Sequence, residues 1–430
     1  MKFSICNLGC KVNNYEANWY SQQLGLKYEE VPFGHEKADI FIINSCTVTN
    51  TAGSKTRQMM HKARKLNPEA CICVVGCYVQ MEYQNENIFK DCDILIGSNH
   101  KTELPDLIEQ FLADRKRIVR VEEFERCPFE TMNIKSFNQT RAYLKIQDGC
   151  NQFCSYCVIP FARGRERSLD PDTVIEIARQ LTESGHKELV LTGIHTGRYR
   201  YEDTDFTALV KRLLNEVKGL ERLRVSSIEV TELTDEFIQL LASDERMGKH
   251  LHVPLQTGCD SVLKAMRRPY VTADYQAVID KIRAQVPSIS ISSDVIVGFP
   301  QESEEEFAST CDFIKKSGLS FLHVFPYAAK AHTVAAAMKG QVREEVKRQR
   351  VTDLTDISHG LYYNFIKKMT GKEGKVLFET YHDGVLSGHN SEYVVVEVES
   401  ERDLSGQMCD VRYVTAAQDH LVGELTGNQK

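Results

Sequence analysis

Short apolar runs alternate with longer amphipathic stretches along most of this chain, and this alternation limits its fold more than any other feature. Six such runs follow residue 134, and the segments between them carry apolar residues at helical spacing. Repeated strand–helix alternation predicts a parallel sheet with helices on its outer side. With six units rather than eight, we expect a partial (β/α)6 TIM-like barrel whose working face lies at the carboxyl ends of its strands. The predicted strands are residues 142–147, 188–192, 223–229, 250–255, 289–297 and 321–325.

The first 112 residues show the same alternation on a smaller scale. Their apolar runs predict an N-terminal α/β domain with a parallel sheet, in which ligands bind at the carboxyl edge. Residues 113–135 are charged and irregular, and we interpret them as a linker or a single extra hairpin. The predicted strands of this domain are residues 2–8, 39–44, 70–76 and 93–97.

The end of the chain has a different character. A polar helix is expected from about residue 342 to 369, and glycine-bounded alternating runs follow it at residues 375–380, 392–398 and 408–414. These runs predict a small antiparallel β-barrel, a fold that often binds RNA. The sequence therefore predicts an α/β protein of three domains, with bounds at residues 1–133, 134–368 and 369–430.

Composition and charge exclude several classes of protein. No apolar run approaches the roughly 18 residues that a membrane-spanning helix needs, and the N-terminus does not look like a secretion signal, so we expect a cytoplasmic protein without a membrane partner. The formal net charge of −7 argues against a generally basic protein that coats nucleic acid. Any contact with a polyanion then needs a local basic patch.

Three cysteines lie close together in a loop after the first predicted barrel strand. Cys150, Cys154 and Cys157 are separated by three and then two residues. Thiolates suit iron–sulfur clusters, and three of them can bind three irons of a [4Fe–4S] cube and leave one iron open. The alternative is a zinc site completed by a distant residue, although zinc motifs usually pair their cysteines in matched knuckles.

A second group of cysteines is hidden in the linear sequence. Cys10, Cys46 and Cys77 each lie just beyond the carboxyl end of a predicted parallel strand. Because such strand ends meet at one edge of a sheet, these cysteines can share a second [4Fe–4S] cluster. The alternative is three unrelated buried thiols. We expect the remaining cysteines to be packing residues, with Cys73 as the strongest candidate for an exception.

The loop from Cys150 to Cys157, with Tyr156 before its last cysteine, resembles the radical S-adenosylmethionine signature. Together the two cysteine groups resemble the radical S-adenosylmethionine methylthiotransferases over essentially the whole chain. Residues 8–16 are similar to the motif of members that act on N6-threonylcarbamoyladenosine at tRNA position 37. Residues from about 370 onward look like the TRAM domain of this family. Further matching motifs are residues 44–49, 76–80, 157–168, 224–229, 252–258 and 293–300.

The resemblance implies two [4Fe–4S] clusters and two molecules of S-adenosylmethionine. One molecule methylates a sulfur attached to the Cys10/Cys46/Cys77 cluster. The other binds the open iron of the Cys150/Cys154/Cys157 cluster and is cleaved to a 5′-deoxyadenosyl radical, which removes hydrogen from adenine C2. The implied partners are a tRNA anticodon stem-loop, an electron-donor protein and a sulfur source, and we expect a monomer. The three domains would be the methylthiotransferase, radical S-adenosylmethionine and TRAM domains.

Several other residues are candidates for binding S-adenosylmethionine or tRNA. Polar or small residues at strand ends can hold S-adenosylmethionine, although Glu229 and Gln256 can equally make structural hydrogen bonds at the barrel rim. Arginines near the cluster loop and at residues 267–268 can contact phosphates. The candidates for S-adenosylmethionine are Tyr156, Gly193, Ser227, Glu229, Gln256 and Asp294. Those for RNA are Arg163, Arg165, Arg167, Arg267 and Arg268.

One segment departs from the family pattern. Members typically carry Ser-x-Arg-x-Gly-Thr after the sixth strand, whereas residues 328–333 are Ala-Ala-Lys-Ala-His-Thr. Lysine does not replace arginine in planar recognition, and histidine in place of glycine is strained at positive φ. The contacts of this loop are therefore expected to differ from those of the family.

The sequence thus predicts a sulfur-containing group transferase that methylthiolates threonylcarbamoyladenosine 37 of tRNA. The nearest alternatives are the same chemistry on isopentenyladenosine 37 or on a ribosomal-protein aspartate. An alternative of another class is a non-catalytic RNA-binding protein that uses zinc or clusters structurally.

Overall fold

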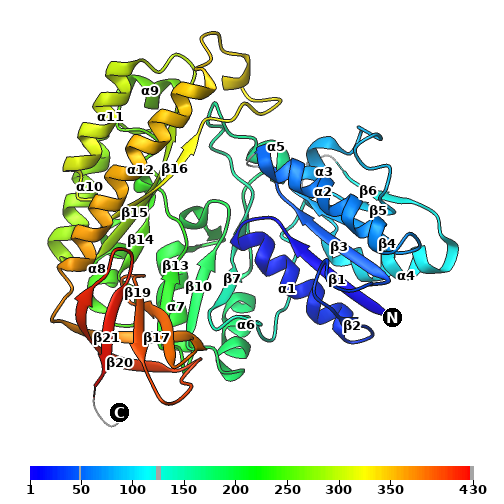
Figure 1. The fold of residues 1–430 in the computed structure, drawn as a ribbon, viewed down its shortest axis with the longest axis horizontal. Coiled ribbons are helices and arrows are strands. Elements are labelled where there is room, and N and C mark those ends of the chain that lie inside the picture. Colours follow the sequence, from blue (N-terminus) through cyan, green and yellow to red (C-terminus); the bar gives the residue numbers. More distant parts are fainter. Residues whose placement is uncertain (48–49, 123–126, 427–430) are drawn as a thin grey trace.

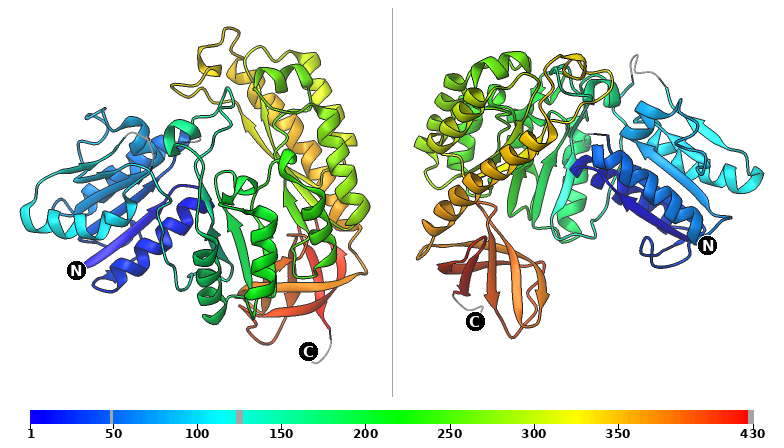
Figure 2. Two further views of the ribbon diagram at one scale, coloured as in Figure 1. Left: turned by 180° about the vertical axis from the view of Figure 1, so that it is seen from behind. Right: turned by 45° about the horizontal axis from the view of Figure 1, so that its top comes forward.

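The computed structural model describes residues 1–47, 50–122 and 127–426 (Figure 1). The chain forms an N-terminal α/β part, a central part with an arc of parallel strands, and a C-terminal barrel that lies against the central part (Figures 1 and 2). Among the described residues, no helix combines the length and the apolar character required to cross a bilayer.

The N-terminal part is a six-stranded, fully parallel sheet. Its strands, in spatial order, are β2 (Glu29–Glu30), β1 (Lys2–Asn7), β3 (Ile40–Ser45), β4 (Cys71–Gly76), β5 (Ile94–Ile96) and β6 (Ile118–Arg120). The central strands β3 and β4 are buried at every residue because helices cover both faces of the sheet. Its helices are α1 (Lys11–Gly25), α2 (Asn50–Leu66), α3 (Cys77–Glu82), η1 (Lys101–Glu103) and α4 (Leu104–Asp114).

The predicted parallel sheet is confirmed, but the interpretation of residues 113–135 as a linker or hairpin is wrong for β6. This strand pairs parallel to β5 and extends the sheet by one edge strand. An edge strand has only one neighbour and needs little apolar sequence, so its three residues carried no clear strand pattern.

The central part contains the six predicted strands, all parallel to their partners. They form two three-stranded sheets, which are joined where Leu223 forms an isolated bridge with Met247. The six strands are β7 (Ala142–Lys145), β10 (Glu188–Thr192), β13 (Arg222–Val225), β14 (His250–His252), β15 (Ser290–Val297) and β16 (Phe321–Pro326). The predicted partial barrel is thereby confirmed.

The principal helices of this part are α6 (Pro171–Glu183), α7 (Phe206–Glu216), α8 (Asp235–Ser243), α10 (Thr272–Gln285), α11 (Glu304–Lys316) and α12 (Glu344–Lys367). Its shorter helices are α5 (Ile159–Arg163), η2 (Thr196–Arg198), η3 (Val230–Glu232), α9 (Asp260–Ala265) and η4 (Ala335–Ala337). Its two minor strand pairs are β8 (Gln147–Asp148) with β9 (Arg167–Ser168), and β11 (Arg200–Tyr201) with β12 (Thr204–Asp205).

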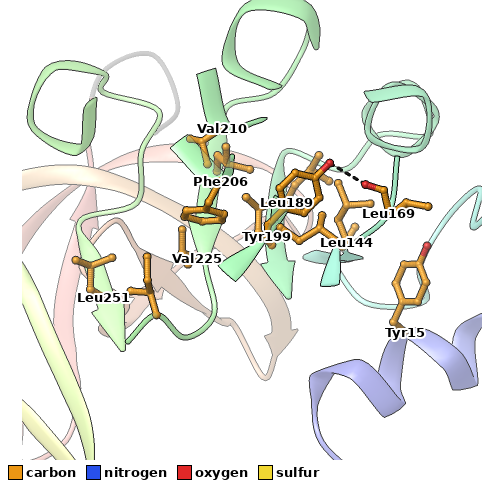
Figure 3. Packing of buried hydrophobic residues seen from close by; sticks show 14 of the residues in the cluster. Tyr15, Leu144, Leu169, Leu189, Tyr199, Phe206, Val210, Val225 and Leu251 are labelled. Carbon is orange, nitrogen blue, oxygen red and sulfur yellow. Dashed lines mark hydrogen bonds between the residues drawn. The ribbon is translucent and has the colours of Figure 1, made fainter. Parts of the chain in front are cut away.

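One hydrophobic core joins the first two parts. Side chains of successive strands pack against α7, and Tyr15 of α1 lies next to this core (Figure 3). The Tyr15 hydroxyl donates a hydrogen bond to the carbonyl of Met132, at 2.5 Å. A shared core fixes the position of the N-terminal sheet edge relative to the barrel mouth, which any reaction between them requires.

The C-terminal part is a closed five-stranded barrel with a core of its own. Its strands are β17 (Glu373–His382), β18 (Val385–Asn390), β19 (Val395–Glu399), β20 (Met408–Ala416) and β21 (Leu421–Leu425). The barrel was predicted as antiparallel, but β19 and β21 pair in parallel to close it. Arg222 and Arg224 of β13 fix the barrel to the central part through hydrogen bonds to its backbone carbonyls.

Candidate functional site

The loop with Cys150, Cys154 and Cys157 borders a cavity of about 760 Å³ at the carboxyl ends of the barrel strands. The loop begins at Gly149, whose φ of +74° lets the chain turn sharply. All three cysteines line this first cavity, together with the predicted Tyr156, Ser227, Glu229, Gln256 and Asp294. The structure therefore brings five of the six predicted S-adenosylmethionine contacts to one place. Gly193 lines a second, larger cavity, which it shares with Ser227 and Asp294.

A buried guanidinium lies beside one of these thiols. Arg268 Nη1 donates to Cys154 Sγ at 3.3 Å, and the same guanidinium pairs with Glu229. Burial raises the pKa of Cys154, and it raises the pKa of Cys157 to about 12. Since a metal ligand must be a thiolate, loading of this loop releases protons, and the arginine favours the anionic sulfur.

The prediction that Arg268 contacts RNA is wrong. Its side chain is 3% exposed and its charge is neutralised by Glu229. Contact with a backbone phosphate needs a cation on the surface, whereas Arg268 lies in the wall of the first cavity. The neighbouring Arg267 is exposed and stays a candidate for RNA contact.

Gln256 has an unusual backbone. Its φ is +71°, a conformation that residues other than glycine rarely adopt. Hydrogen bonds hold it there, because its amide donates to the Asp294 carbonyl at 2.9 Å and its carbonyl accepts from the Ile296 amide at 2.8 Å. Such strain at a cavity wall is typical of functional positions.

His195 was missed by the sequence analysis, although it follows the second barrel strand closely. Its Nδ1 lies 3.5 Å from Cys150 Sγ and 3.4 Å from Glu166, and its Nε2 lies 2.6 Å from Glu232. Burial lowers the pKa of His195, but hydrogen bonds to these partners outweigh it and raise the pKa to about 12. These contacts fix the imidazole beside the cluster loop, and Cys150, Glu166 and His195 place ligand atoms within 4.8 Å of one another.

The second group of cysteines lies at the sheet edge, as the strand pattern predicted. Cys10 directly precedes α1, Cys46 follows β3, and Cys77 opens α3. The turn into α3 depends on Gly76, whose φ is +99°. A Cβ at this glycine would lie 2.9 Å from the Ser45 carbonyl oxygen, so a larger residue would displace Cys77.

Two of these cysteines are linked to the barrel by Arg163. Its Nε donates to Cys77 Sγ at 3.2 Å, and its Nη2 donates to Asn13 Oδ1 at 3.1 Å. Asn13 Oδ1 in turn lies 3.3 Å from Cys10 Sγ. Cys46 is buried directly after β3. Two of the three cysteines, Cys10 and Cys77, are therefore connected through Asn13 and Arg163 to the central part.

The prediction that Arg163 contacts RNA is also wrong. It is 1% exposed and pairs with Glu16 and Asp148, each at 3.2 Å. Arg167 is largely withdrawn as well, since it donates to the Arg163 carbonyl and pairs with Asp148 at 3.5 Å. Of the three arginines in this run, only Arg165 is exposed.

Arg165 belongs to an exposed patch that sequence reasoning did not find. Its guanidinium lies over the ring of Phe153, at 5.1 Å, and Phe153 meets Phe161 edge to face at 6.1 Å. Both aromatic rings are exposed. A cation and two open rings beside the cluster loop are the groups that stack on unpaired bases.

The second cavity measures about 1130 Å³ and is lined by all three parts of the molecule. Cys10 and Lys11 come from the N-terminal part, Gly193 and His323 from the barrel strands, and Tyr393 from the C-terminal barrel. Ser227, Asp294 and Phe325 line both cavities, so the two spaces adjoin. Cys10 therefore faces a space that borders the three cysteines of the barrel loop.

The segment that departs from the family pattern lies at the rim of the first cavity. Ala328, Ala329 and Lys330 line it. His332 has a φ of +68°, which confirms that histidine occupies a conformation favoured by glycine. The loop therefore keeps the backbone turn at the cost of local strain.

Comparisons with known proteins agree with this geometry. The Radical SAM superfamily model matches residues 144–314, and the model of uncharacterized protein family UPF0004 matches residues 2–97. The structure of the radical S-adenosylmethionine methyltransferase TsrM from Kitasatospora setae has a TM-score of 0.58 at 14% identity, over 78% of this chain and 77% of that one. This likeness concerns the fold alone.

Relatives of known function match nearly the whole chain. The threonylcarbamoyladenosine tRNA methylthiotransferase MtaB of Bacillus subtilis is 39% identical over 97% of this chain and 95% of its own length. Its namesake from Aquifex aeolicus is 34% identical, over 93% of this chain and 100% of its own length. The tRNA-2-methylthio-N(6)-dimethylallyladenosine synthase of Carboxydothermus hydrogenoformans is 32% identical, over 98% of this chain and 99% of its own length. With S-adenosylmethionine and one [4Fe–4S] cluster implied by the superfamily, this chain belongs to the radical S-adenosylmethionine tRNA methylthiotransferases.

Proposed function

We propose that this enzyme converts N6-threonylcarbamoyladenosine at position 37 of tRNA to its 2-methylthio derivative. The observation that carries the proposal is the junction of the two cavities, one lined by Cys10 and the other by Cys150, Cys154 and Cys157. A base held at this junction would have a thiol-bearing sheet edge on one side and the radical-forming loop on the other. Relatives with this substrate in their names support the choice of nucleoside.

Two triads of cysteines would hold two [4Fe–4S] clusters. Cys150, Cys154 and Cys157 would bind the one that reacts with S-adenosylmethionine, and Cys10, Cys46 and Cys77 the auxiliary one. The residues fit this assignment, because a buried guanidinium donates to Cys154 and another to Cys77, and such donors stabilise the thiolates that a cluster needs. When bound, the clusters supply the electron that cleaves S-adenosylmethionine and a site for the transferred sulfur.

Two molecules of S-adenosylmethionine would be consumed, one as methyl donor and one as the source of the 5′-deoxyadenosyl radical. The first cavity is the proposed binding site, with Tyr156, Ser227, Gln256 and Asp294 as contacts. Glu229 would contribute from its ion pair with Arg268. The burial of this cavity among barrel strands excludes water from a reactive radical.

The tRNA would bind across all three domains, for which we propose the bounds 1–133, 134–368 and 369–430. Arg165, Arg267 and the exposed rings of Phe153 and Phe161 would contact the anticodon stem-loop near the cluster loop. The C-terminal barrel would contact it from the other side. The reaction also requires an electron-donor protein and a sulfur source, while the monomeric state and cytoplasmic location stay predictions.

Nucleoside mass spectrometry of tRNA from cells with and without the gene tests the substrate. Loss of only the methylthio group from threonylcarbamoyladenosine in the deletion strain is the expected result. An unchanged profile of that nucleoside would remove the assignment. Loss of the methylthio group from isopentenyladenosine in the same tRNA would support that nucleoside as substrate instead. Mass spectrometry of the ribosomal proteins tests the aspartate alternative.

Anaerobic reconstitution tests the cofactors. Two cubes predict about eight irons per chain and reductive cleavage of S-adenosylmethionine. If the chain holds only about four irons but still cleaves S-adenosylmethionine, the proposed auxiliary cluster is contradicted and the cluster of the Cys150 loop is not. Membership of an enzyme family already argues against the non-catalytic alternative, and stoichiometric zinc without cleavage would be needed to revive it.

A further inference from the structure

The second cavity is lined by a lysine, Lys11, that forms no ion pair with a carboxylate among the described residues, and burial lowers its pKa. Among the described residues, no hydrogen bond or ion pair reaches the ammonium of Lys11, which lines the cavity directly after Cys10. The two other cations of this region are paired: Arg224 with Glu188 at 2.9 Å, and Arg141 with Glu379 at 3.2 Å. Removing a cation from water without a counter-ion is costly, so the cavity favours an anionic ligand.

The carboxylates of the cavity wall do not compensate Lys11. Asp294 pairs with His252 at 3.2 Å, and Asp419 pairs with His420 at 2.9 Å. The rest of the wall is rich in histidine, with His250, His252 and His323 near the barrel strands. Burial lowers the pKa of His250 and His323, and the charge of Lys11 lowers them further. His250 and His323 therefore donate hydrogen bonds without adding charge, and Lys11 is the lysine or arginine of this cavity wall that can pair with an anion.

A bound metal ion is a poor alternative occupant. Ligand atoms of His252, Asp294 and His323 lie within 4.8 Å of one another, which is close enough to hold a cation. The unpaired ammonium of Lys11 and the guanidinium of Arg224, both of which depress the pKa of the adjacent His250, would repel it. The charge of this wall suits an anion.

We infer that Lys11 binds the carboxylate of the threonyl group on the modified adenosine and so selects an acidic N6 substituent. This inference rests on the proposed function. The cavity is large enough for a modified nucleoside, and Lys11 adjoins the cysteine where the transferred sulfur would be held. To reach Lys11, a backbone phosphate would have to enter the cavity as deeply as the base. The carboxylate is attached to the base itself, so it is the favoured anion. An apolar isopentenyl group would leave the ammonium unpaired.

The experiment compares two anticodon stem-loop RNAs with the reconstituted holoenzyme. One carries threonylcarbamoyladenosine, and the other carries the same group with its carboxylate converted to an amide. A charge-assisted hydrogen bond predicts that wild-type enzyme prefers the acid by about tenfold or more in kcat/KM. Lys11→Met should remove this preference by slowing the acid substrate alone, and Lys11→Arg should retain it.

Lys218→Met is the matched control, because Lys218 is exposed and lines neither cavity. This variant should keep the wild-type preference between acid and amide. Iron content and cleavage of S-adenosylmethionine without RNA show whether Lys11→Met has disturbed the cluster at Cys10. If that variant loses iron, the preference of wild type and Lys11→Arg for the acid decides the question.

The outcomes separate the two proposals. Wild-type enzyme that fails to methylthiolate the acid substrate would overturn the proposed function. Wild-type enzyme that is active on the acid but treats acid and amide alike would overturn the role of Lys11 only. A Lys11→Met variant that slows both substrates equally would also overturn it, since Lys11 would then serve a phosphate or the cluster.

Discussion

Arg163 joins Cys77 of the N-terminal part to the central part, and its removal should affect both stability and cluster binding. The side chain contacts Cys77, Asn13, Glu16 and Asp148, all at 3.1–3.3 Å. Glu16 belongs to α1 of the N-terminal part, and Asp148 ends β8, two residues before Cys150. Arg163→Met keeps much of the side-chain volume but removes every one of these hydrogen bonds.

The magnitude follows from the buried ion network around Arg163. Glu16 also pairs with Lys101 at 2.7 Å, and Asp148 with Lys145 at 2.7 Å, so neither carboxylate is left unpaired. Because each carboxylate keeps another cation, the loss is that of charge-assisted hydrogen bonds, about 1.5–3 kcal/mol. At about 2–4 °C per kcal/mol for domains of this size, the unfolding temperature should fall by about 3–12 °C.

The second effect concerns Cys77. Four cations, Lys101, Lys145, Arg163 and Arg167, surround two carboxylates in this network, so positive charge is in excess beside the Cys77 sulfur. Without Arg163 the thiolate loses its donor, and the auxiliary cluster should bind weakly. Reconstituted Arg163→Met should therefore hold about four irons per chain rather than about eight, with four from the Cys150 loop.

Thermal unfolding and iron content, measured on anaerobically reconstituted enzyme, test both effects. Arg350→Met is the matched control, because Arg350 is equally buried and pairs with Glu302 at 2.8 Å and Glu304 at 2.7 Å, without contact to a cysteine. It should lower the unfolding temperature and leave the iron content unchanged. The reasoning is refuted if Arg163→Met unfolds like wild type and keeps its full iron content.

Three further predictions concern the auxiliary cluster, the ion network and the RNA patch. Cys46→Ala should abolish methylthiolation but leave cleavage of S-adenosylmethionine, as measured by 5′-deoxyadenosine release; survival of both activities would show that Cys46 is not a ligand. Burial would raise the pKa of Glu16, but Lys101, Arg163 and Lys145 lower it from 4.5 to about 2. Its folded-state pKa is thus depressed, so its stabilisation of roughly 3 kcal/mol is complete above pH 4.5 and fades as the pH falls toward 2. Acid unfolding of Glu16→Gln should lack this component, and an identical pH profile would contradict the pairing. Arg165→Ala should weaken the affinity for the stem-loop and lower the slope of log affinity against log salt concentration by about one. Phe153→Ala should weaken the affinity but leave this slope unchanged. Equal salt slopes for the two variants would argue against this division of roles.

The order of strands and helices followed from the sequence because it depends on local patterns. Apolar runs of strand length and amphipathic stretches predicted all six strands of the partial barrel within a few residues. The positions of Cys10, Cys46 and Cys77 were equally predictable, since the direction of parallel strands places their carboxyl ends at one edge. The closing of the C-terminal barrel by β19 and β21 was not, because the pairing direction of distant strands leaves no local signal.

The sequence by itself determined which residues can bind clusters, and the tertiary structure decided what surrounds them. Arg163 and Arg165 are two residues apart and alike in the sequence, yet one is buried against Cys77 and the other is exposed beside Phe153. The difference arises because Glu16, 147 residues away, meets Arg163 only after the two domains pack together. Burial of the Arg163 charge is favourable because folding brings the carboxylates of Glu16 and Asp148 to it, whereas Arg165 stays in solvent.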